Sequence, residues 1–174
     1  MLKKEYRQSI FNLEKIKKAL SYKNDLVTNI LILINKNYLN EWESASNLFK
    51  EISVNKQLDK TTVDSIRTIY SKFPKLKKQK AAYLWSFIPG MGIVYAGKTF
   101  EGILNFSLNA LPLYLGVHQV VNKFYYTGYF GGAILIEKFY FGGRKRAKYL
   151  VKKYNYNVSF NYNLKLKELL LSLL

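Results

Sequence analysis

The 174-residue chain contains no cysteine and a single histidine, His118. Without cysteine, the protein has no disulfide, no thiolate nucleophile and no cysteine-ligated metal site. One histidine also excludes a histidine relay and a site with several histidine ligands. No phosphate-binding loop, catalytic carboxylate pair or nucleophile next to a base is visible in the sequence. We therefore expect a non-enzymatic protein with no cofactor and no metal.

Acidic residues are few, and charge of either sign is scarce in the middle of the chain. Residues 81–143 contain three Lys/Arg and two Asp/Glu, whereas residues 1–80 contain 17 and eight, and residues 144–174 contain eight and one. A stretch rich in Tyr, Phe, Leu and Gly between basic flanks is typical of a segment surrounded by hydrocarbon. A nucleic-acid-binding domain would interleave its basic and aromatic residues. We therefore expect a lipid bilayer as partner, and we disfavour nucleic acid.

Residues 1–74 have the periodicity of four amphipathic helices facing water. Thr61, Thr62 and Asp64 are candidate N-cap residues for the fourth helix, and Pro74 follows its end. The apolar positions that carry the helical spacing are Ile10, Leu13, Ile16, Leu20, Leu26, Ile30, Leu33, Ile34, Trp42, Ala45, Leu48, Phe49, Ile52, Val63, Ile66, Ile69, Tyr70 and Phe73.

Residues 40–49 resemble the second half of a tetratricopeptide repeat, since Trp42 lies three residues before the small Ala45 and Phe49 lies four after it. Tetratricopeptide-like helices bind peptides, so the resemblance implies that these three residues belong to a surface for a protein partner. An ordinary amphipathic helix with a small residue at its contact is the alternative interpretation. No second copy aligns with this segment, so any solenoid is short or atypical.

The membrane domain is predicted over residues 75–156. Four lysines precede residues 81–95, which are too short and too interrupted at Pro89-Gly90 to span and which fit an interfacial or re-entrant helix. Residues 100–121 and 124–141 are each long enough to cross a bilayer. Basic clusters on both sides predict a two-helix transmembrane hairpin with both flanks in the cytoplasm. The fold class predicted for the whole chain is all-α.

The C-terminal residues 157–174 form a basic, Leu-rich tail in this interpretation. Apolar and polar residues alternate from Tyr154 to Asn163, which is a strand-like pattern, and a Leu-rich helical segment follows. The sequence thus favours a short strand and a helix at the membrane surface.

The most specific motif is the run Pro89, Gly90, Gly92, Tyr95, Gly97 and Lys98, followed by Gly102 and Asn109. Proline ends a helix, and glycine permits positive φ or a close approach between backbones. Gly97 is expected to turn the chain before the first span, with Tyr95 and Lys98 beside the turn.

This run resembles the Pro-Gly-x-Gly-x-x-Tyr-x-Gly signature of the small two-transmembrane-span domain family, and more closely the C-terminal membrane domain of bacterial tetratricopeptide-type envelope proteins. The resemblance covers about residues 78–156 and implies a multi-pass protein of the bacterial inner membrane, with outer-membrane association as an alternative. The sequence departs from the pattern at Ile93, Phe139 and Gly143. Residues in the order that the family shows near its end are Glu137, Phe139, Tyr140, Gly142, Ala147, Lys153, Tyr154 and Asn155.

Gly128 and Gly132 form a small-xxx-small pair that suits close helix packing, within the hairpin or between protomers. Glu137 either has a partner across the hairpin or lies at the rim and reaches water. We expect an adaptor or scaffold in envelope or membrane-protein biogenesis, with a protein partner in a membrane complex. The alternatives are a membrane-anchored nucleic-acid binder and a subunit of an oligomeric pore or transporter, whose polar path would be lined by Glu101, Asn105, Asn109 and Glu137.

Overall fold

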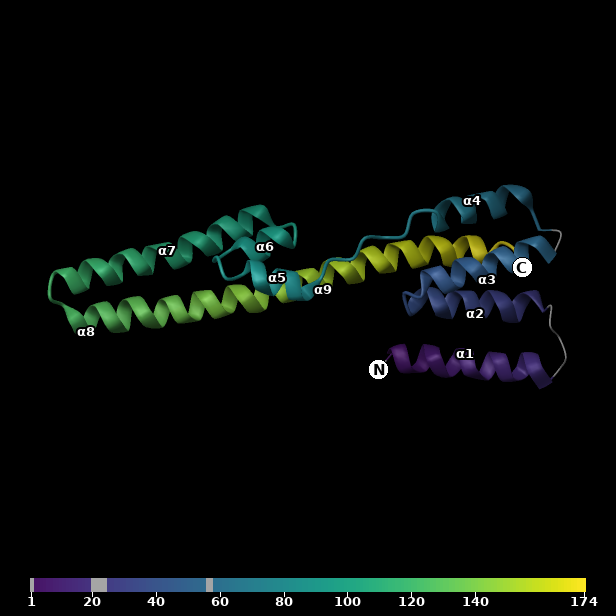
Figure 1. Cartoon of the computed structure of the whole chain (residues 1–174), viewed down its shortest axis with the longest axis horizontal. Helices are drawn as coiled ribbons and strands as arrows, with labels where there is room; N and C mark the ends of the chain where they lie inside the picture. The colour runs from purple at the N-terminus through teal and green to yellow at the C-terminus, as the bar shows by residue number, and fades with distance from the viewer. Residues whose placement is uncertain (1, 20–24, 56–57) are drawn as a thin grey trace. The chain divides into compact units, whose positions relative to one another are not determined.

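The computed structural model describes residues 2–19, 25–55 and 58–174, and all the regular elements within these ranges are helical. The all-α prediction is therefore confirmed for this part of the chain (Figure 1). In order, the elements are α1 (Leu2–Ala19), α2 (Leu26–Tyr38), α3 (Trp42–Asn55), α4 (Lys60–Tyr70), α5 (Gln79–Trp85), α6 (Met91–Tyr95), α7 (Thr99–Val121), α8 (Tyr125–Gly128), the π-helix η1 (Tyr129–Ala133) and α9 (Ile134–Leu171).

The chain divides into two compact units. Unit 1 contains Met1–Lys75 together with Asn157–Leu174, and unit 2 contains Leu76–Tyr156. The C-terminal residues, which the sequence sets apart as a tail, thus pack with the N-terminal helices. Helix α9 contributes its first part to unit 2 and its last part to unit 1.

The core of unit 1 is built from α2, α3, α4 and the end of α9. Most of the apolar positions predicted for α2, α3 and α4 fall in one cluster. Ile10, Leu13 and Ile16 of α1 lie outside it, Ile16 and Phe73 are exposed, and Leu20 lies outside the described residues. Phe49 and Tyr70 pack with their ring centroids 5.9 Å apart. The buried members of the cluster are Ile30, Leu33, Ala45, Phe49, Ile52, Val63, Ile66, Tyr70, Leu166 and Leu170.

Two helices of unit 1, α2 and α4, begin after an aspartate. The Asp25 side chain accepts a hydrogen bond from the Thr28 amide at 3.0 Å, and Asp59 accepts one from the Thr62 amide at 2.9 Å. The predicted cap of α4 is therefore corrected from Thr61, Thr62 or Asp64 to Asp59, because only the residue before the first turn can reach these free amides. Hydrogen bonds from Thr61 and Thr62 lower the pKa of the Asp59 carboxyl to about 2.

Residues 154–163 are helical, so the predicted strand is wrong. Ser159, Asn163, Leu166 and Leu170 are the buried positions of this part of α9, and their spacing of four, three and four residues is helical. The Asn163 side-chain oxygen accepts a hydrogen bond from the Trp42 indole at 2.9 Å, deep within unit 1. Tertiary contacts with α3 and α4 thus select the helix over the local alternation.

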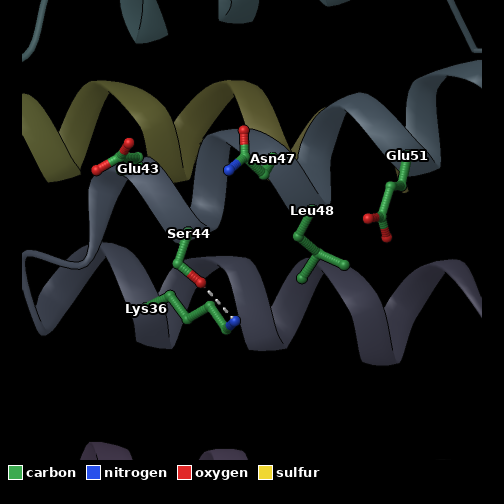
Figure 2. A pocket seen from close by; sticks show the side chains of 6 residues that line it. All are labelled: Lys36, Glu43, Ser44, Asn47, Leu48 and Glu51. Carbon is green, nitrogen blue, oxygen red and sulfur yellow. Dashed lines mark hydrogen bonds between the residues drawn. The ribbon is translucent and has the colours of Figure 1, made fainter.

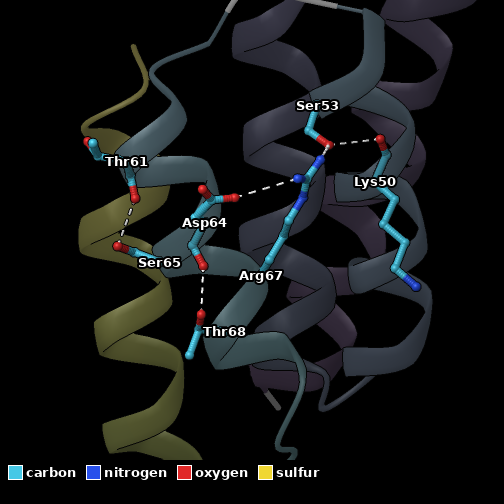
Figure 3. Close-up of polar contacts among 7 residues, drawn as sticks. All are labelled: Lys50, Ser53, Thr61, Asp64, Ser65, Arg67 and Thr68. Atoms are coloured by element: carbon cyan, nitrogen blue, oxygen red, sulfur yellow. Dashed lines mark hydrogen bonds and ion pairs between the residues drawn. The ribbon is translucent and has the colours of Figure 1, made fainter.

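The outer surface of α3 and α4 carries a chain of polar contacts, which Figure 3 shows. Arg67 donates a hydrogen bond to the Ser53 hydroxyl at 3.1 Å and pairs with Asp64 at 3.6 Å, while the Ser53 hydroxyl donates to the Lys50 carbonyl. Because these side chains are exposed, each such contact contributes little to stability. The buried cluster, rather than this surface, holds unit 1 together.

Unit 2 contains a long antiparallel hairpin. Its first arm is α7, and its second arm is α8, η1 and the start of α9 through Phe141; the chain turns at Asn122–Phe124, where Lys123 has φ +67° (Figure 1). We call these two arms the hairpin. The segment expected to form one interrupted interfacial helix over residues 81–95 is two short helices, α5 and α6, separated by Pro89-Gly90. Among the residues that the structure describes, none of the helices has both the length and the apolar character that crossing a membrane requires.

Candidate functional site

Gly90 and Gly102 bring the start of α6 into backbone contact with α7. Gly90 has φ +83°, and a Cβ atom at this position would collide with the Gly102 carbonyl oxygen and lie 3.3 Å from the Phe106 amide nitrogen. A Cβ atom on Gly102 would lie 2.8 Å from the Gly90 carbonyl oxygen. The positive φ and the close approach expected at Gly90 are therefore confirmed, and only glycine fits there without strain.

Gly92 packs into a small core between α5, α6 and α9. A Cβ atom on it would collide with the Ser86 hydroxyl and lie 3.0 Å from the Ala147 Cβ atom. The buried members of this second cluster are Ala82, Ile93, Ala96, Ala147, Leu150 and Val151. Gly92, Ala82 and Ala147 leave room for the three helices to approach closely.

The turn after α6 is joined to the end of unit 2 through Lys77. The Lys77 amide donates to the Asn155 side-chain oxygen at 2.8 Å, and the Asn155 amide group donates back to the Lys77 carbonyl at 2.8 Å. The Lys77 ammonium donates to the Tyr95 carbonyl at 2.9 Å and lies 4.4 Å from the centre of the Tyr154 ring. Gly97, with φ +96°, turns the chain beside this ammonium group.

Lys77 is the residue that links these motif positions, and the sequence reveals it only as one of several lysines. Its role depends on partners that are 18 and 78 residues away, so no local pattern indicates it. A Cβ atom built on Gly142 would have no described residue within 4 Å, apart from its chain neighbours and the backbone of its own helix. Tyr140 donates to the Phe87 carbonyl at 3.5 Å, and Lys98 is exposed at the N-cap of α7. Pro89 is half-buried in the turn before Gly90.

The hairpin is packed with small and polar residues inside and large apolar residues outside. Gly102, Asn109 and Pro112 are the buried residues of α7. The large apolar side chains of the same helix are exposed around its circumference, from Phe100 at 81% to Val121 at 74%. The others are Ile103, Leu104, Phe106, Leu108, Leu111, Leu113, Tyr114, Leu115, Val117 and Val120.

The second arm shows the same arrangement and meets α7 through glycines. A Cβ atom on Gly132 would lie 2.9 Å from the Gly116 Cα atom, and one on Gly128 would lie 3.0 Å from the Gly116 carbonyl oxygen. The structure thus places Gly128 and Gly132 against Gly116, within one hairpin. Exposed large side chains of this arm are Tyr125, Tyr126, Tyr129, Phe130, Ile134, Leu135 and Phe141.

Polar side chains inside unit 2 are used in local contacts. Asn105 donates to the Phe139 carbonyl at 3.4 Å, and Asn109 donates to the Asn105 carbonyl at 2.7 Å, while the buried Asn109 side-chain oxygen accepts no hydrogen bond from any described residue. Glu101 forms a two-atom ion pair with Arg146, whose terminal nitrogen lies 3.3 Å from the second carboxylate oxygen. Glu137 is exposed and forms no ion pair with a described residue.

The three residues predicted for a partner surface, Trp42, Ala45 and Phe49, lie in the interior of unit 1. Their exposed fractions are 7%, 0% and 1%. The prediction is wrong for these residues because the apolar face of α3 is covered by α2, α4 and α9 within the same chain.

The accessible face of α3 is polar instead. An open groove of about 500 Å³ lies between α2 and α3, and the Lys36 ammonium there donates to the Ser44 hydroxyl at 2.9 Å. Figure 2 shows the side chains that line it. Its lining residues are Lys36, Glu43, Ser44, Asn47, Leu48 and Glu51.

Two surfaces are therefore candidates for function: the apolar exterior of the hairpin in unit 2 and the polar groove of unit 1. The first presents aliphatic and aromatic side chains, which suit an apolar environment. The second presents carboxylates and amides, which suit a polar segment of another protein. No protein-family model, no curated protein and no solved structure matches this chain.

Proposed function

We propose that this protein is a non-enzymatic membrane adaptor, in which unit 2 inserts its two-helix hairpin into a lipid bilayer and unit 1 offers a water-facing surface to a protein partner. The observation that carries the proposal is the hairpin itself. Gly116, Gly128 and Gly132 meet between the two arms, and large apolar side chains are exposed along both arms.

This arrangement is costly in water and favourable in hydrocarbon. Water-soluble monomers rarely expose a continuous apolar patch larger than a few hundred Å². Removing one large apolar side chain from water contributes about 1.5–3 kcal/mol, and α7 alone exposes twelve. Helices in lipid associate through small residues and through hydrogen bonds between them, which is how Gly116, Gly132 and Asn105 are used here.

The dimensions of the hairpin also support insertion. A helix needs about 20 residues to cross the hydrocarbon core of a bilayer. Helix α7 has 23 residues and is long enough, although no described helix combines this length with the apolar character that crossing requires. Asn105, Asn109 and Gln119 lower the average apolar character of α7, and the second arm is divided among three helical elements. Asn105 donates to the Phe139 carbonyl of the second arm and Asn109 is buried, so these two amide side chains add little polar area to the outer surface.

Extraction of membranes tests the insertion. We expect the full-length protein to remain with membranes in high salt and in alkaline carbonate, because apolar surface rather than charge holds it. Release by carbonate would refute the proposal.

A matched pair of variants makes the test specific to the hairpin. The double variant Phe106→Lys, Leu113→Lys places charge on two exposed positions of α7 and should reduce membrane retention. Val54→Lys, at a position that is 79% exposed in unit 1, should leave retention unchanged.

The adaptor part of the proposal is supported by the groove of unit 1. Glu43 and Glu51 supply acceptors there, and Lys36 is already bonded to Ser44, so the groove suits a polar segment with basic side chains. A photo-cross-linking residue at Asn47 should give one discrete adduct in membranes. The double variant Glu43→Lys, Glu51→Lys should abolish this adduct, and the control Asp64→Lys on α4 should keep it. Equal amounts of adduct in the protein without these substitutions, in the double variant and in the control would exclude the groove as the docking site.

A further inference from the structure

Tyr83 of α5 lies against two cations from α9. The Arg144 guanidinium carbon is 3.9 Å from the centre of its ring, and the Lys148 ammonium nitrogen is 4.2 Å from the same point. Arg144 also lies 5.0 Å from the Phe87 ring centre and 5.4 Å from that of Tyr140. Aromatic rings thus hold two positive charges, one helical turn apart, at one place on the surface.

These cations have no anion among the residues that the structure describes. The Arg144 Nε atom is buried and donates no hydrogen bond to a described residue, and neither Arg144 nor Lys148 forms an ion pair with one. The acids of unit 2 are Glu101, which pairs with Arg146, and Glu137, which is exposed without an ion pair. A positive site that pairs with neither of these carboxylates suits a bound anion.

The site has a shape as well as a charge. A hollow of about 390 Å³ is lined by Gln79, Lys80, Tyr83, Leu84 and Lys148, so it adds a third cation, Lys80, and no carboxylate. Exposed apolar side chains follow directly along α5 and the next residues: Leu84 is 62% exposed, Trp85 51% and Phe87 62%. Cations and apolar side chains therefore stand side by side.

We propose that Lys80, Tyr83, Arg144 and Lys148 form a binding site, the cation site, for the phosphate of an anionic glycerophospholipid. The planar guanidinium of Arg144 and the two ammonium groups would contact the phosphate oxygens. The acyl chains would cover Leu84, Trp85 and Phe87, which a free phosphate ion leaves in water. The inference deepens the proposed membrane function and rests on it.

Quenching of tryptophan fluorescence by brominated lipids measures the binding. The chain has two tryptophans: Trp85 is half-exposed beside the site, and Trp42 is buried in unit 1. Full-length protein in detergent micelles is titrated with dibrominated phosphatidylglycerol or with dibrominated phosphatidylcholine. We expect half-quenching at an at least tenfold lower mole fraction of phosphatidylglycerol, and Trp85→Phe should remove the quenching.

Variants assign the preference to the cation site. Lys80→Gln with Lys148→Gln should bring the two lipids to within about twofold of each other, and Tyr83→Leu should weaken the preference while keeping the apolar contact. Lys165→Gln with Lys167→Gln, which removes the same charge from unit 1, should change nothing. Far-UV circular dichroism shows whether each variant is folded. If either Lys80→Gln, Lys148→Gln or Tyr83→Leu fails to fold, the other still tests the site.

Three distinct results would overturn the proposed lipid site. Equal quenching by both lipids would overturn the head-group site while leaving insertion of the hairpin intact, because the carbonate experiment tests insertion separately. Displacement of phosphatidylglycerol by millimolar inorganic phosphate would assign the site to a free anion and overturn the lipid. An unchanged preference in Lys80→Gln, Lys148→Gln would place lipid selection elsewhere in the chain.

Discussion

Adding a single methyl group at Gly132 should separate the two arms of the hairpin. The Cβ atom of Gly132→Ala would lie 2.9 Å from the Gly116 Cα atom and 3.4 Å from the Pro112 carbonyl oxygen, both of which are backbone atoms that cannot rotate away. At the neighbouring Gly131, no atom of a described residue lies within 4 Å of such a group, apart from the chain neighbours and the backbone of the same helix. The two variants therefore add the same methyl group, one to a contact and one to open space.

The two substitutions should change the free energy of unfolding of the hairpin differently. Alanine is favoured over glycine inside a helix by about 1 kcal/mol, and this gain applies to both positions. Overpacking at Gly132 costs about 1–3 kcal/mol. Gly131→Ala should thus raise the free energy of unfolding of the hairpin, and Gly132→Ala should lie below Gly131→Ala by about 1–3 kcal/mol.

Energy transfer between two dyes measures this difference. Because the chain has no cysteine, one cysteine at Phe100 and one at Phe141 can be labelled specifically, and both positions are exposed near the open end of the hairpin. Titration with sodium dodecyl sulfate in mixed micelles should separate the dyes at a lower denaturant fraction for Gly132→Ala than for Gly131→Ala. Coincident transitions for the two variants would refute the glycine contact as the basis of packing.

Three further predictions concern the turn, the core of unit 1 and the topology. Gly90→Ala should destabilise unit 2 more than Gly97→Ala, because both positions have positive φ but only Gly90 meets the Gly102 carbonyl; equal losses in thermal unfolding would contradict this. Burial raises the pKa of Tyr70 to about 12 from an ordinary value of 10, because the folded state favours the neutral phenol. This contribution to stability is therefore complete below pH 10 and is lost as the pH rises through about 12. Tyr70→Phe should flatten that part of the stability curve of unit 1. In right-side-out inner-membrane vesicles, a cysteine at Asn122 should react with an impermeant thiol reagent and one at Lys145 should not; labelling of both would mean that the hairpin does not cross.

Local signals in the sequence were sufficient for the helices of residues 1–74 and for the principal turn. Apolar spacing of three and four residues indicates α2, α3 and α4 because one face of each must leave water. Pro89-Gly90 indicates the break between α5 and α6 because proline lacks an amide and glycine alone adopts φ +83° at little cost. The scarcity of charge over residues 81–143 likewise follows from the sequence and matches an apolar exterior in the structure.

Only the tertiary structure decided which faces are covered and which distant residues meet. Trp42 and Phe49 have the composition of a binding surface, yet α9 returns more than a hundred residues later to bury them, with Asn163 accepting the Trp42 indole hydrogen. The same contacts make residues 154–163 helical, although alternation along the chain favours a strand. Arg144 against Tyr83 and Lys77 against Asn155 are likewise pairs of high sequence separation. Periodicity reports the environment of one element at a time, so it indicates that a face is buried but not which partner buries it.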